Sequence, residues 1–331
     1  MQISIIGAGS WGTAFARLTS LNGHPTHLWA RREEQAKKLR KIRENKQYLP
    51  GYRLPGEKLT ISNDLPRVVN HADVIFFAVP SFAMREICVR VNGYLSGGNV
   101  NLVNLAKGIE GETFNTMSEV LAEEIASGTI LTLSGPSHAE GVAAGDPTAV
   151  VLAGDTGPGS IIQKELSTDS FRIYLSRDLK GVEYCGAIKN VVAVATGVAR
   201  GLGFGDNTIG SLIARGLAEM VRFGNYLGAT KETFFGLAGV GDLVATCTSE
   251  HSRNRSFGVK IGKGENPKNI LEGMDMVAEG VHTAKIVHLL ADKLDIAVPI
   301  TDSLYRIIYE DSSPSKEVNK LMSREFKVEK F

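Results

Sequence analysis

Three glycines close to the N-terminus have the spacing of a phosphate-binding turn. Gly7, Gly9 and Gly12 form a G-x-G-x-x-G pattern in "IIGAGSWG", directly after an apolar run. The first glycine of this pattern allows a tight turn, the second lets the backbone approach a pyrophosphate, and the third lets the next helix pack on the strand. The helix N-terminus then presents unpaired N–H groups to the phosphates. The pattern therefore predicts a dinucleotide site, with an ordinary strand-to-helix turn as the alternative.

Two arginines stand where a dinucleotide-binding chain usually carries an acid. That acid, at the end of the second strand, binds the ribose hydroxyls and repels a 2′-phosphate. Here the segment "LWARR" ends in Arg31 and Arg32, and guanidinium groups can bind a phosphate through two donors at once. We therefore expect NADPH/NADP as the cofactor, with NADH/NAD also accepted. The alternative is that the two arginines only begin a charged helix.

A lysine in an apolar helix is the best candidate for proton transfer. Lys189 and Asn190 interrupt the small and apolar residues of "YCGAIKNVVAVATG". Burial lowers the pKa of an ammonium group toward neutrality, where it can donate a proton to a carbonyl oxygen that receives a hydride. The alternative is a lysine whose stem crosses apolar surface while its ammonium group reaches water. His138 is a weaker candidate for the same role, because a lone loop histidine is more often only a hydrogen-bonding group.

Further polar residues follow apolar runs or glycine-rich turns. Lys107 follows the run "VNLVNLA", and the turn "LSGPSHAEG" follows the next run, which places both at strand ends where substrates bind in this fold. Asp242 follows a glycine-rich turn, and Ser252, Arg253 and Asn254 form a polar cluster suited to a small anion such as phosphate. Alone, such a cluster is usually a surface loop or a helix cap. No spacing predicts a metal site or a P-loop.

A sheet and a set of helices must position these residues. In the first half, apolar runs typical of strands buried on both faces of a parallel sheet alternate with helical segments. The expected strands are 3–7, 26–30, 74–79, 100–106, 130–134, 148–154 and 171–176, and the expected helices include 12–22 and the charged, solvent-facing segment 33–46. After residue 178 we expect helices over 181–200, 207–228, 277–293 and 300–310. The prediction is a Rossmann-type, doubly wound α/β domain over 1–178, followed by an all-α domain over 179–331.

Composition narrows the function classes. A chain of 331 residues is long enough for two domains, and its 43% hydrophobic residues are ordinary for a globular protein. The net charge of +1 provides no global field that would attract nucleic acid or an anionic membrane. Three widely spaced cysteines favour a reducing compartment. With no signal peptide and no membrane span recognised, we expect a soluble, cytoplasmic protein.

Together these segments resemble bacterial-type NAD(P)-dependent glycerol-3-phosphate dehydrogenase. The resemblance runs from residue 3 to about residue 326 and includes "GAGSWGTAFA", "NLAKGIE", "LSGPSHAEGVA", "GAIKNVVAVATG" and "GLAGVGDLVATCTSEHSRNRSFG". It implies reversible reduction of dihydroxyacetone phosphate to sn-glycerol 3-phosphate, which supplies glycerophospholipid synthesis. It leaves the oligomeric state open, a homodimer included.

The resemblance also implies a role for each matching residue. Lys189 matches the family's proton donor and acceptor. The implied substrate contacts are Lys107, Gly135, Ser137, Asp242, Ser252, Arg253 and Asn254. The implied cofactor contacts are Gly7, Gly9, Ser10, Trp11, Gly12, Arg31, Arg32, Lys107, Ala139, Arg253, Val277 and Glu279. Two alternatives remain: a hydroxyacid dehydrogenase of similar architecture that acts on a carboxylate substrate, and a non-catalytic dinucleotide sensor.

Overall fold

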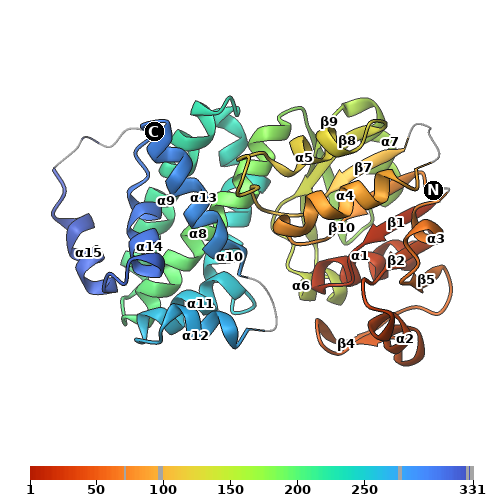
Figure 1. Cartoon of the computed structure of the whole chain (residues 1–331), viewed down its shortest axis with the longest axis horizontal. Coiled ribbons are helices and arrows are strands. Elements are labelled where there is room, and N and C mark those ends of the chain that lie inside the picture. Colours follow the sequence, from red (N-terminus) through yellow and green to blue (C-terminus); the bar gives the residue numbers. More distant parts are fainter. Residues whose placement is uncertain (71, 96–99, 275–277, 326–327, 329–331) are drawn as a thin grey trace. The chain divides into compact units, whose positions relative to one another are not determined.

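The chain divides into two structural units. A computed structural model describes residues 1–331 except 71, 96–99, 275–277, 326–327 and 329–331. The first unit comprises Met1–Lys107 and Asn115–Leu179, and the second comprises Gly108–Phe114 and Lys180–Phe331 (Figure 1). The sequence predicts that residues 108–114 belong to the first domain. In the structure this segment contacts α13 (Glu279–Lys293) of the second unit, where the ammonium group of Lys293 lies 5.8 Å from the Phe114 ring.

The first unit is built on an eight-stranded sheet with the order β10-β9-β8-β7-β6-β1-β2-β5. Its strands are β1 (Ile3–Ile6), β2 (Thr26–Trp29), β5 (Leu59–Ser62), β6 (Val74–Phe77), β7 (Asn101–Asn104), β8 (Thr129–Ser134), β9 (Thr148–Gly154) and β10 (Phe171–Ser176). Its helices are α1 (Ser10–Leu21), α2 (Glu33–Ile42), α3 (Leu65–Val69), α4 (Met84–Asn92), α5 (Met117–Glu124), α6 (Ala139–Ala144) and α7 (Thr156–Leu166), with a short 3₁₀ turn, η1 (Ser81–Ala83). This architecture confirms the predicted doubly wound α/β domain.

Helices cover both faces of this sheet. Ile5 and Phe76 belong to a core that includes residues of α1, α2, α6 and α7. Their neighbours Ile6 and Phe77 point the opposite way and pack with residues of α3, α4 and α5. Successive strand residues face opposite sides of a sheet, so a sheet covered on both sides requires continuous apolar runs. That requirement is why the strands could be recognised in the sequence.

The sheet differs from the sequence prediction in the direction of two strands and in one strand that was not predicted. Strand β9 pairs antiparallel with β8, and β10 pairs parallel with β9, so these two strands run against the other six. An apolar run carries no signal of strand direction when both faces are buried. The edge strand β5 was not predicted, because its short segment "LTIS" mixes polar and apolar residues.

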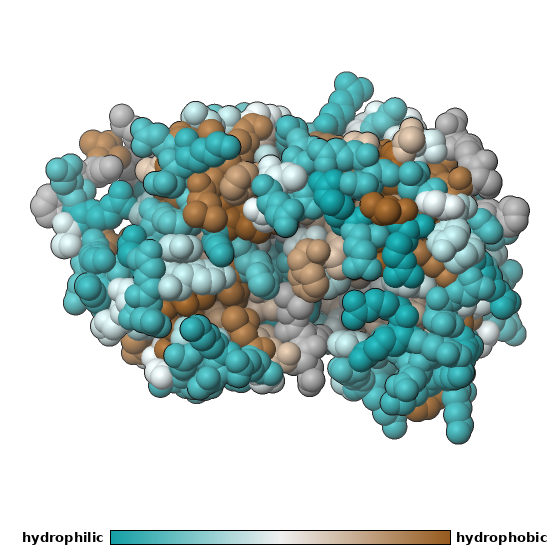
Figure 2. Space-filling view, in the orientation of Figure 1, coloured by the Kyte–Doolittle hydropathy of each residue, from teal (hydrophilic) through white to brown (hydrophobic). Residues whose placement is uncertain are grey.

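The predicted helix 33–46 is also shorter than expected. It ends at Ile42, and Arg43 adopts a left-handed conformation with φ of 55°. The chain then forms a small antiparallel pair, β3 (Glu44–Asn45) with β4 (Leu49–Arg53). Only Ala36 and Leu39 of α2 are buried, and the visible surface around this helix is largely hydrophilic (Figure 2). The prediction that most of this segment faces solvent is confirmed for α2.

The described part of the second unit is helical. It contains α8 (Leu179–Gly201, whose first residue clusters with the first unit), α9 (Asp206–Tyr226), α10 (Asp242–Thr248), α11 (Arg253–Gly262), α12 (Pro267–Glu272), α13, α14 (Pro299–Tyr309) and α15 (Pro314–Met322), with short turns η2 (Lys231–Phe235) and η3 (Leu237–Gly241). Helix α8 has 18 of its 23 residues buried. A helix buried on nearly all sides needs small and apolar residues, and most of α8 is of this kind, with Glu183, Lys189 and Asn190 as buried polar exceptions.

The hydropathy of the described helices is moderate. None of them combines the length and the apolar character needed to cross a membrane.

Candidate functional site

The three glycines of the N-terminal turn have three different surroundings. Gly7 follows β1 with φ of +117°, a conformation that favours glycine. A Cβ atom at Gly12 would lie 2.0 Å from the Gly7 carbonyl oxygen, so only glycine lets α1 pack this closely on the turn. A Cβ atom at Gly9 would have no atom within 4 Å. The backbone at Gly9 is therefore open to a ligand, at the N-terminus of α1 where Ser10 and Trp11 begin the helix.

Two side chains outside the predicted site hold this turn in place. Both Gln35 Nε2 and Asn45 Nδ2 donate to the Ala8 carbonyl oxygen, at 2.9 and 3.1 Å. Asn45 Nδ2 also donates to Thr13 Oγ1 at 2.8 Å. Because these residues lie tens of positions apart in the chain, no local pattern could have indicated the contacts.

Arg31 and Arg32 lie directly after β2, as predicted. The preceding residue, Ala30, still bonds to the neighbouring strand end through its N–H, which donates to the Ser62 carbonyl oxygen at 2.9 Å. Both arginines are exposed, and Arg32 is the N-cap residue of α2. Within the described residues, neither guanidinium group makes a hydrogen bond or an ion pair with the protein. Both cations are thus available to an anionic ligand at this strand end.

Three of the predicted substrate residues meet at one carbonyl group. Lys107 Nζ donates to the Gly135 carbonyl oxygen at 3.0 Å, and Ser137 Oγ donates to the same oxygen at 2.9 Å. Lys107 follows β7 and Gly135 follows β8, which are adjacent parallel strands. Ala139 begins α6 and packs in one apolar cluster with Trp11. The fold therefore gathers these residues at the carboxyl end of the sheet, whereas His138 serves as the N-cap residue of α6.

In the second unit, Lys189 is buried beside two partners from α10. Its ammonium nitrogen lies 2.6 Å from Asp242 Oδ1 and 2.5 Å from Thr246 Oγ1, and Thr246 Oγ1 donates to Asp242 Oδ1 at 3.2 Å. Lys189 is 4% exposed and Asp242 is 2% exposed. The alternative in which the ammonium group reaches water is therefore wrong. Burial penalises both charges, but each partner favours the charged form of the other.

Thr246 was missing from the predicted site. It lies four residues after Asp242 on α10, and residues at that spacing share one face of a helix. This spacing was the available signal. The turn η3 directly before Asp242 has π-helical geometry, which often marks functional sites.

The nearby thiol of Cys247 is not a competing nucleophile. Burial raises its pKa to about 11, although a hydrogen bond with Thr196 and the charge of Lys189 oppose that rise. The thiol is therefore protonated at neutral pH, and a protonated thiol is a poor nucleophile. Cys247 therefore offers no thiolate beside the Lys189 ammonium group.

The cluster Ser252-Arg253-Asn254 forms the start of α11. Ser252 is the N-cap residue, and its Oγ accepts a hydrogen bond from the Arg255 N–H at 3.2 Å. Arg253 is the first helical residue and is exposed. The cluster is thus partly a helix cap, which is the alternative that the sequence allows, and its exposed cation, Arg253, lies at the helix N-terminus.

Asn254 connects three helices of the second unit. Its Nδ2 donates to Asn190 Oδ1 on α8 at 2.9 Å, and its Oδ1 accepts from the Gly280 N–H on α13 at 2.9 Å. Asn190 was noticed in the sequence but not assigned to the site. Glu279, a predicted cofactor contact, begins α13 beside Gly280, whereas Val277 lies outside the described residues. Asn254 therefore holds the helices that carry Lys189, Arg253 and Glu279.

Comparisons with known proteins agree along nearly the whole chain. Residues 2–157 match the family model described as NAD-dependent glycerol-3-phosphate dehydrogenase N-terminus, and residues 178–319 match the corresponding C-terminus. A glycerol-3-phosphate dehydrogenase [NAD(P)+] from Pelotomaculum thermopropionicum is 45% identical over 327 residues, which cover 98% of this chain and 93% of the relative.

Solved structures show the same likeness. The glycerol-3-phosphate dehydrogenase from Coxiella burnetii has a TM-score of 0.94 and 37% identity, and the match covers 98% of this chain and 99% of that chain. A ketopantoate reductase from Ralstonia eutropha has a TM-score of 0.65 at 15% identity over 96% of this chain and 100% of that chain, which shows a shared fold alone.

Proposed function

The chain belongs to the NAD-dependent glycerol-3-phosphate dehydrogenase family, and from this membership we infer that it is an NAD(P)-dependent oxidoreductase. The reaction is the reversible reduction of dihydroxyacetone phosphate to sn-glycerol 3-phosphate. The observation that carries its chemistry is the buried Lys189 ammonium group held by Asp242 and Thr246. A non-catalytic sensor has no use for such a group.

We propose that the first unit supplies most of the cofactor contacts. NAD(P)H, when bound, supplies the hydride of the reaction. The open backbone at Gly9 and the N–H groups at the start of α1 fit a pyrophosphate. Arg31 and Arg32 fit a 2′-phosphate, because they replace the acid that would repel it and have no protein partner within the described residues. The other proposed cofactor contacts are Gly7, Ser10, Trp11, Gly12, Lys107, Ala139, Arg253, Val277 and Glu279.

Lys189 is proposed as the general acid and base. In reduction, its Nζ donates a proton to the oxygen of the substrate carbonyl; in oxidation, it takes that proton back. Asp242 and Thr246 fix the position of Nζ, since both accept hydrogen bonds from it. A positioned acid of this kind contributes roughly 100- to 10,000-fold to a rate.

The substrate phosphate is proposed to bind at the start of α11. Arg253 supplies an exposed guanidinium group there, and the helix N-terminus adds its own affinity for anions. Asn254 uses one of its two amide hydrogens on Asn190, so the second remains for a ligand. The remaining proposed substrate contacts are Lys107, Gly135, Ser137, Asp242 and Ser252.

A contrast between two substrates tests this proposal. A three-carbon ketone offers little apolar surface, so its phosphate must provide most of its binding. Arg253→Ala should lower kcat/KM for dihydroxyacetone phosphate by about 2–4 kcal/mol of transition-state stabilisation. Unphosphorylated dihydroxyacetone should be a poor substrate for the wild type and little worse for the variant. Lys260→Ala removes an exposed cation from the same helix and should change neither value.

The measurement is NADPH oxidation followed by absorbance. Equal proportional losses on both substrates would show that Arg253 supports the fold and not the phosphate. A panel of keto acids tests the alternative of a hydroxyacid dehydrogenase, and turnover of a keto acid above that of dihydroxyacetone phosphate would favour that alternative.

The cellular setting is part of the same proposal. All three cysteines are buried thiols outside any disulfide, which fits a reducing cytoplasm. The product, sn-glycerol 3-phosphate, would supply glycerophospholipid synthesis. A homodimer stays a prediction, which sedimentation velocity can test.

A further inference from the structure

Two side-chain amides of the first unit converge on one carbonyl group of the glycine turn. Gln35 of α2 and Asn45 of β3 both donate to the Ala8 oxygen, at 2.9 and 3.1 Å. Ala8 lies between Gly7 and Gly9, in the middle of the turn. A carbonyl oxygen has two lone pairs, so the two amides together use its acceptor capacity. An oxygen held by two donors from two elements has a fixed direction.

The direction of this carbonyl group fixes the direction of the next N–H group. The Ala8 carbonyl and the Gly9 N–H belong to one trans peptide unit, in which the two groups point to opposite sides. Because both amides lie on the carbonyl side, the Gly9 N–H points away from them. No described residue accepts a hydrogen bond from this N–H, and a Cβ atom at Gly9 would meet no atom within 4 Å. The N–H is therefore left for a ligand.

Asn45 also connects the turn to the helix that follows it. Its Nδ2 donates a second hydrogen bond to Thr13 Oγ1 at 2.8 Å, and the Thr13 N–H donates to the Gly9 carbonyl oxygen at 3.0 Å. Asn45 is 3% exposed and Thr13 is fully buried. Both amide hydrogens of Asn45 are thus used inside the protein, and they support the peptide units on both sides of Gly9.

Gln35 supports the turn from the side of the two arginines. It lies in the first turn of α2, which directly follows Arg31 and Arg32. Buried Ala36 and Leu39 pack this helix on the core, whereas Gln35 is only half-buried. The place of α2, and of the arginines before it, therefore depends on Ala36 and Leu39. Gln35 can be changed without moving the arginines.

The two donors also strengthen the N–H of the peptide unit that they hold. Hydrogen bonds in series polarise one another, which strengthens each by roughly 10–30%. Donation to the Ala8 carbonyl draws electrons toward its oxygen and leaves the Gly9 N–H more positive. Hydrogen bonds to charged acceptors are stronger than those to neutral ones. The held peptide unit therefore favours an anion at Gly9.

We propose that Gln35 and Asn45 are positioning residues that direct the Gly9 N–H at the pyrophosphate of the cofactor. This inference rests on the proposed dinucleotide site at the glycine turn. The pyrophosphate is common to NADPH and NADH, whereas Arg31 and Arg32 are assigned to the 2′-phosphate that only NADPH carries. The amides therefore contribute to the affinity for both cofactors, and the arginines contribute to the selectivity between them.

Three ligands test this division on the full chain: NADPH, NADH and adenosine 2′-monophosphate, which has the 2′-phosphate but no pyrophosphate. Gln35→Met keeps the length of the side chain and removes its donor. It should weaken NADPH and NADH by the same factor, roughly 3- to 10-fold, and leave adenosine 2′-monophosphate unchanged. Fluorescence titration measures the two cofactors, and NMR titration measures the monophosphate. In steady-state assays the KM for NADPH should rise while kcat stays unchanged.

Asn45→Asp is the second variant. An ionised aspartate has the shape of asparagine but no hydrogen to donate. Because the bonds to Ala8 and Thr13 are both lost, each cofactor should bind roughly 10-fold or more weakly. The double variant with Gln35→Met should weaken both cofactors by more than the product of the single effects, since neither amide then holds the carbonyl.

The chain offers a matched control for the glutamine. Gln163 of α7 is also half-buried, and its Nε2 donates to the Ile173 carbonyl oxygen of the edge strand β10 at 2.8 Å. Gln163→Met therefore loses the same kind of hydrogen bond at another place in the first unit. All three dissociation constants should stay at their wild-type values.

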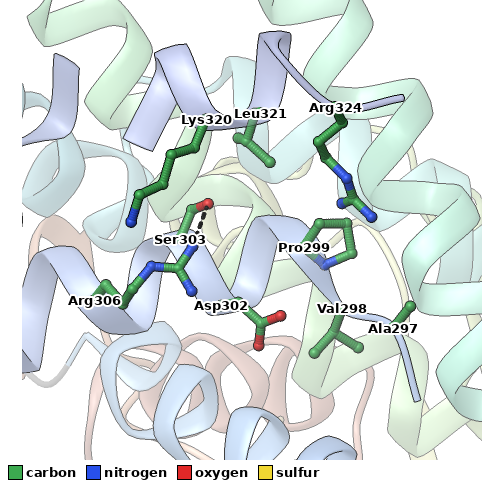
Figure 3. Close-up of a pocket in the computed structure, with 9 residues that line it drawn as sticks. All are labelled: Ala297, Val298, Pro299, Asp302, Ser303, Arg306, Lys320, Leu321 and Arg324. Carbon is green, nitrogen blue, oxygen red and sulfur yellow. Dashed lines mark hydrogen bonds between the residues drawn. The ribbon is translucent and has the colours of Figure 1, made fainter. Parts of the chain in front are cut away.

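A second control lies in the other unit. Figure 3 shows Ser303 beside Arg306 on α14, where they line a cavity, and Arg306 Nη2 donates to Ser303 Oγ at 3.3 Å. Ser303→Ala removes this bond at a buried position outside the proposed site. It shows what a loss of stability alone does to cofactor binding, and we expect no effect.

Three results would overturn the proposal. Unchanged binding of NADPH and NADH in the double variant would show that the amides do not act on the cofactor. A loss for NADPH alone, or weaker binding of adenosine 2′-monophosphate, would place Gln35 at the 2′-phosphate. Equal losses in Gln163→Met or Ser303→Ala would reduce the effect to stability. A wild-type chain that binds neither cofactor would instead refute the proposed function.

Discussion

Replacing Lys189 by methionine separates proton transfer from the stability of the buried pair. Methionine keeps the length and apolar bulk of lysine but has no transferable proton. In the native protein, Lys189 Nζ lies 2.6 Å from Asp242 Oδ1, and both side chains are almost fully buried. Lys189→Met therefore leaves the Asp242 carboxylate buried without its cation.

Two magnitudes follow from this geometry. Removing one partner of a buried ion pair costs about 3–5 kcal/mol of unfolding free energy. Losing a positioned general acid should lower kcat roughly 100-fold or more. A single variant cannot assign the loss of activity to one effect, because a destabilised protein also loses activity.

The double variant Lys189→Met with Asp242→Asn resolves this ambiguity. It removes both charges, and an asparagine at 242 can still hydrogen-bond with Thr246. Most of the lost stability should return, since no unpaired charge stays buried. Turnover should remain at least 100-fold below wild type. Urea unfolding followed by circular dichroism measures the first quantity, and single-turnover NADPH oxidation measures the second.

Two outcomes would refute the reasoning. Near-normal turnover in Lys189→Met would show that Lys189 is not the proton donor. Recovery of turnover together with stability in the double variant would show that Lys189 acts only through the fold. NADPH binding by each variant is the control, because the glycine turn lies in the other unit and should be unaffected.

Three further predictions concern other parts of the molecule. Replacing Arg31 and Arg32 by alanine should cost on the order of 1.5–3 kcal/mol of NADPH binding free energy per bond made to the 2′-phosphate, and should leave NADH binding unchanged. Fluorescence titration measures the binding of each cofactor, and equal losses for the two would contradict the assignment. Gly12→Ala should lower the thermal midpoint of unfolding, because its Cβ atom would lie 2.0 Å from a backbone oxygen. Gly9→Ala should keep the midpoint and weaken NADPH binding, because a Cβ atom there meets no protein atom. A normal midpoint in Gly12→Ala would refute the packing argument. Burial raises the pKa of Glu317, but hydrogen bonds from Arg306, Ser312 and Lys320 outweigh burial and lower this pKa from 4.5 to about 2. Its contribution to stability is therefore complete above pH 4.5 and is lost as the pH falls toward 2. Glu317→Gln should be less stable at pH 7 and should lose stability less steeply in acid. An unchanged acid profile would show that these hydrogen bonds contribute nothing to stability.

Much of the fold could be predicted from local sequence. Strands buried on both faces must be apolar throughout, and the glycine turn requires its spacing, so both patterns are local. The predictions failed where the signal was not local. Strand direction at β9 depends on how the chain returns to the sheet, and the end of α2 depends on the left-handed conformation of Arg43.

The sequence by itself determined the nature of the chemical groups: a glycine turn, two arginines after a strand, and a lysine in an apolar helix. Only the tertiary structure decided their partners. Lys189 meets Asp242 across 53 residues of sequence, and Asn254 meets Asn190 across 64. These pairings depend on how the helices pack, because hydrogen bonds form only within about 3 Å and sequence patterns report only the few residues on one helix face.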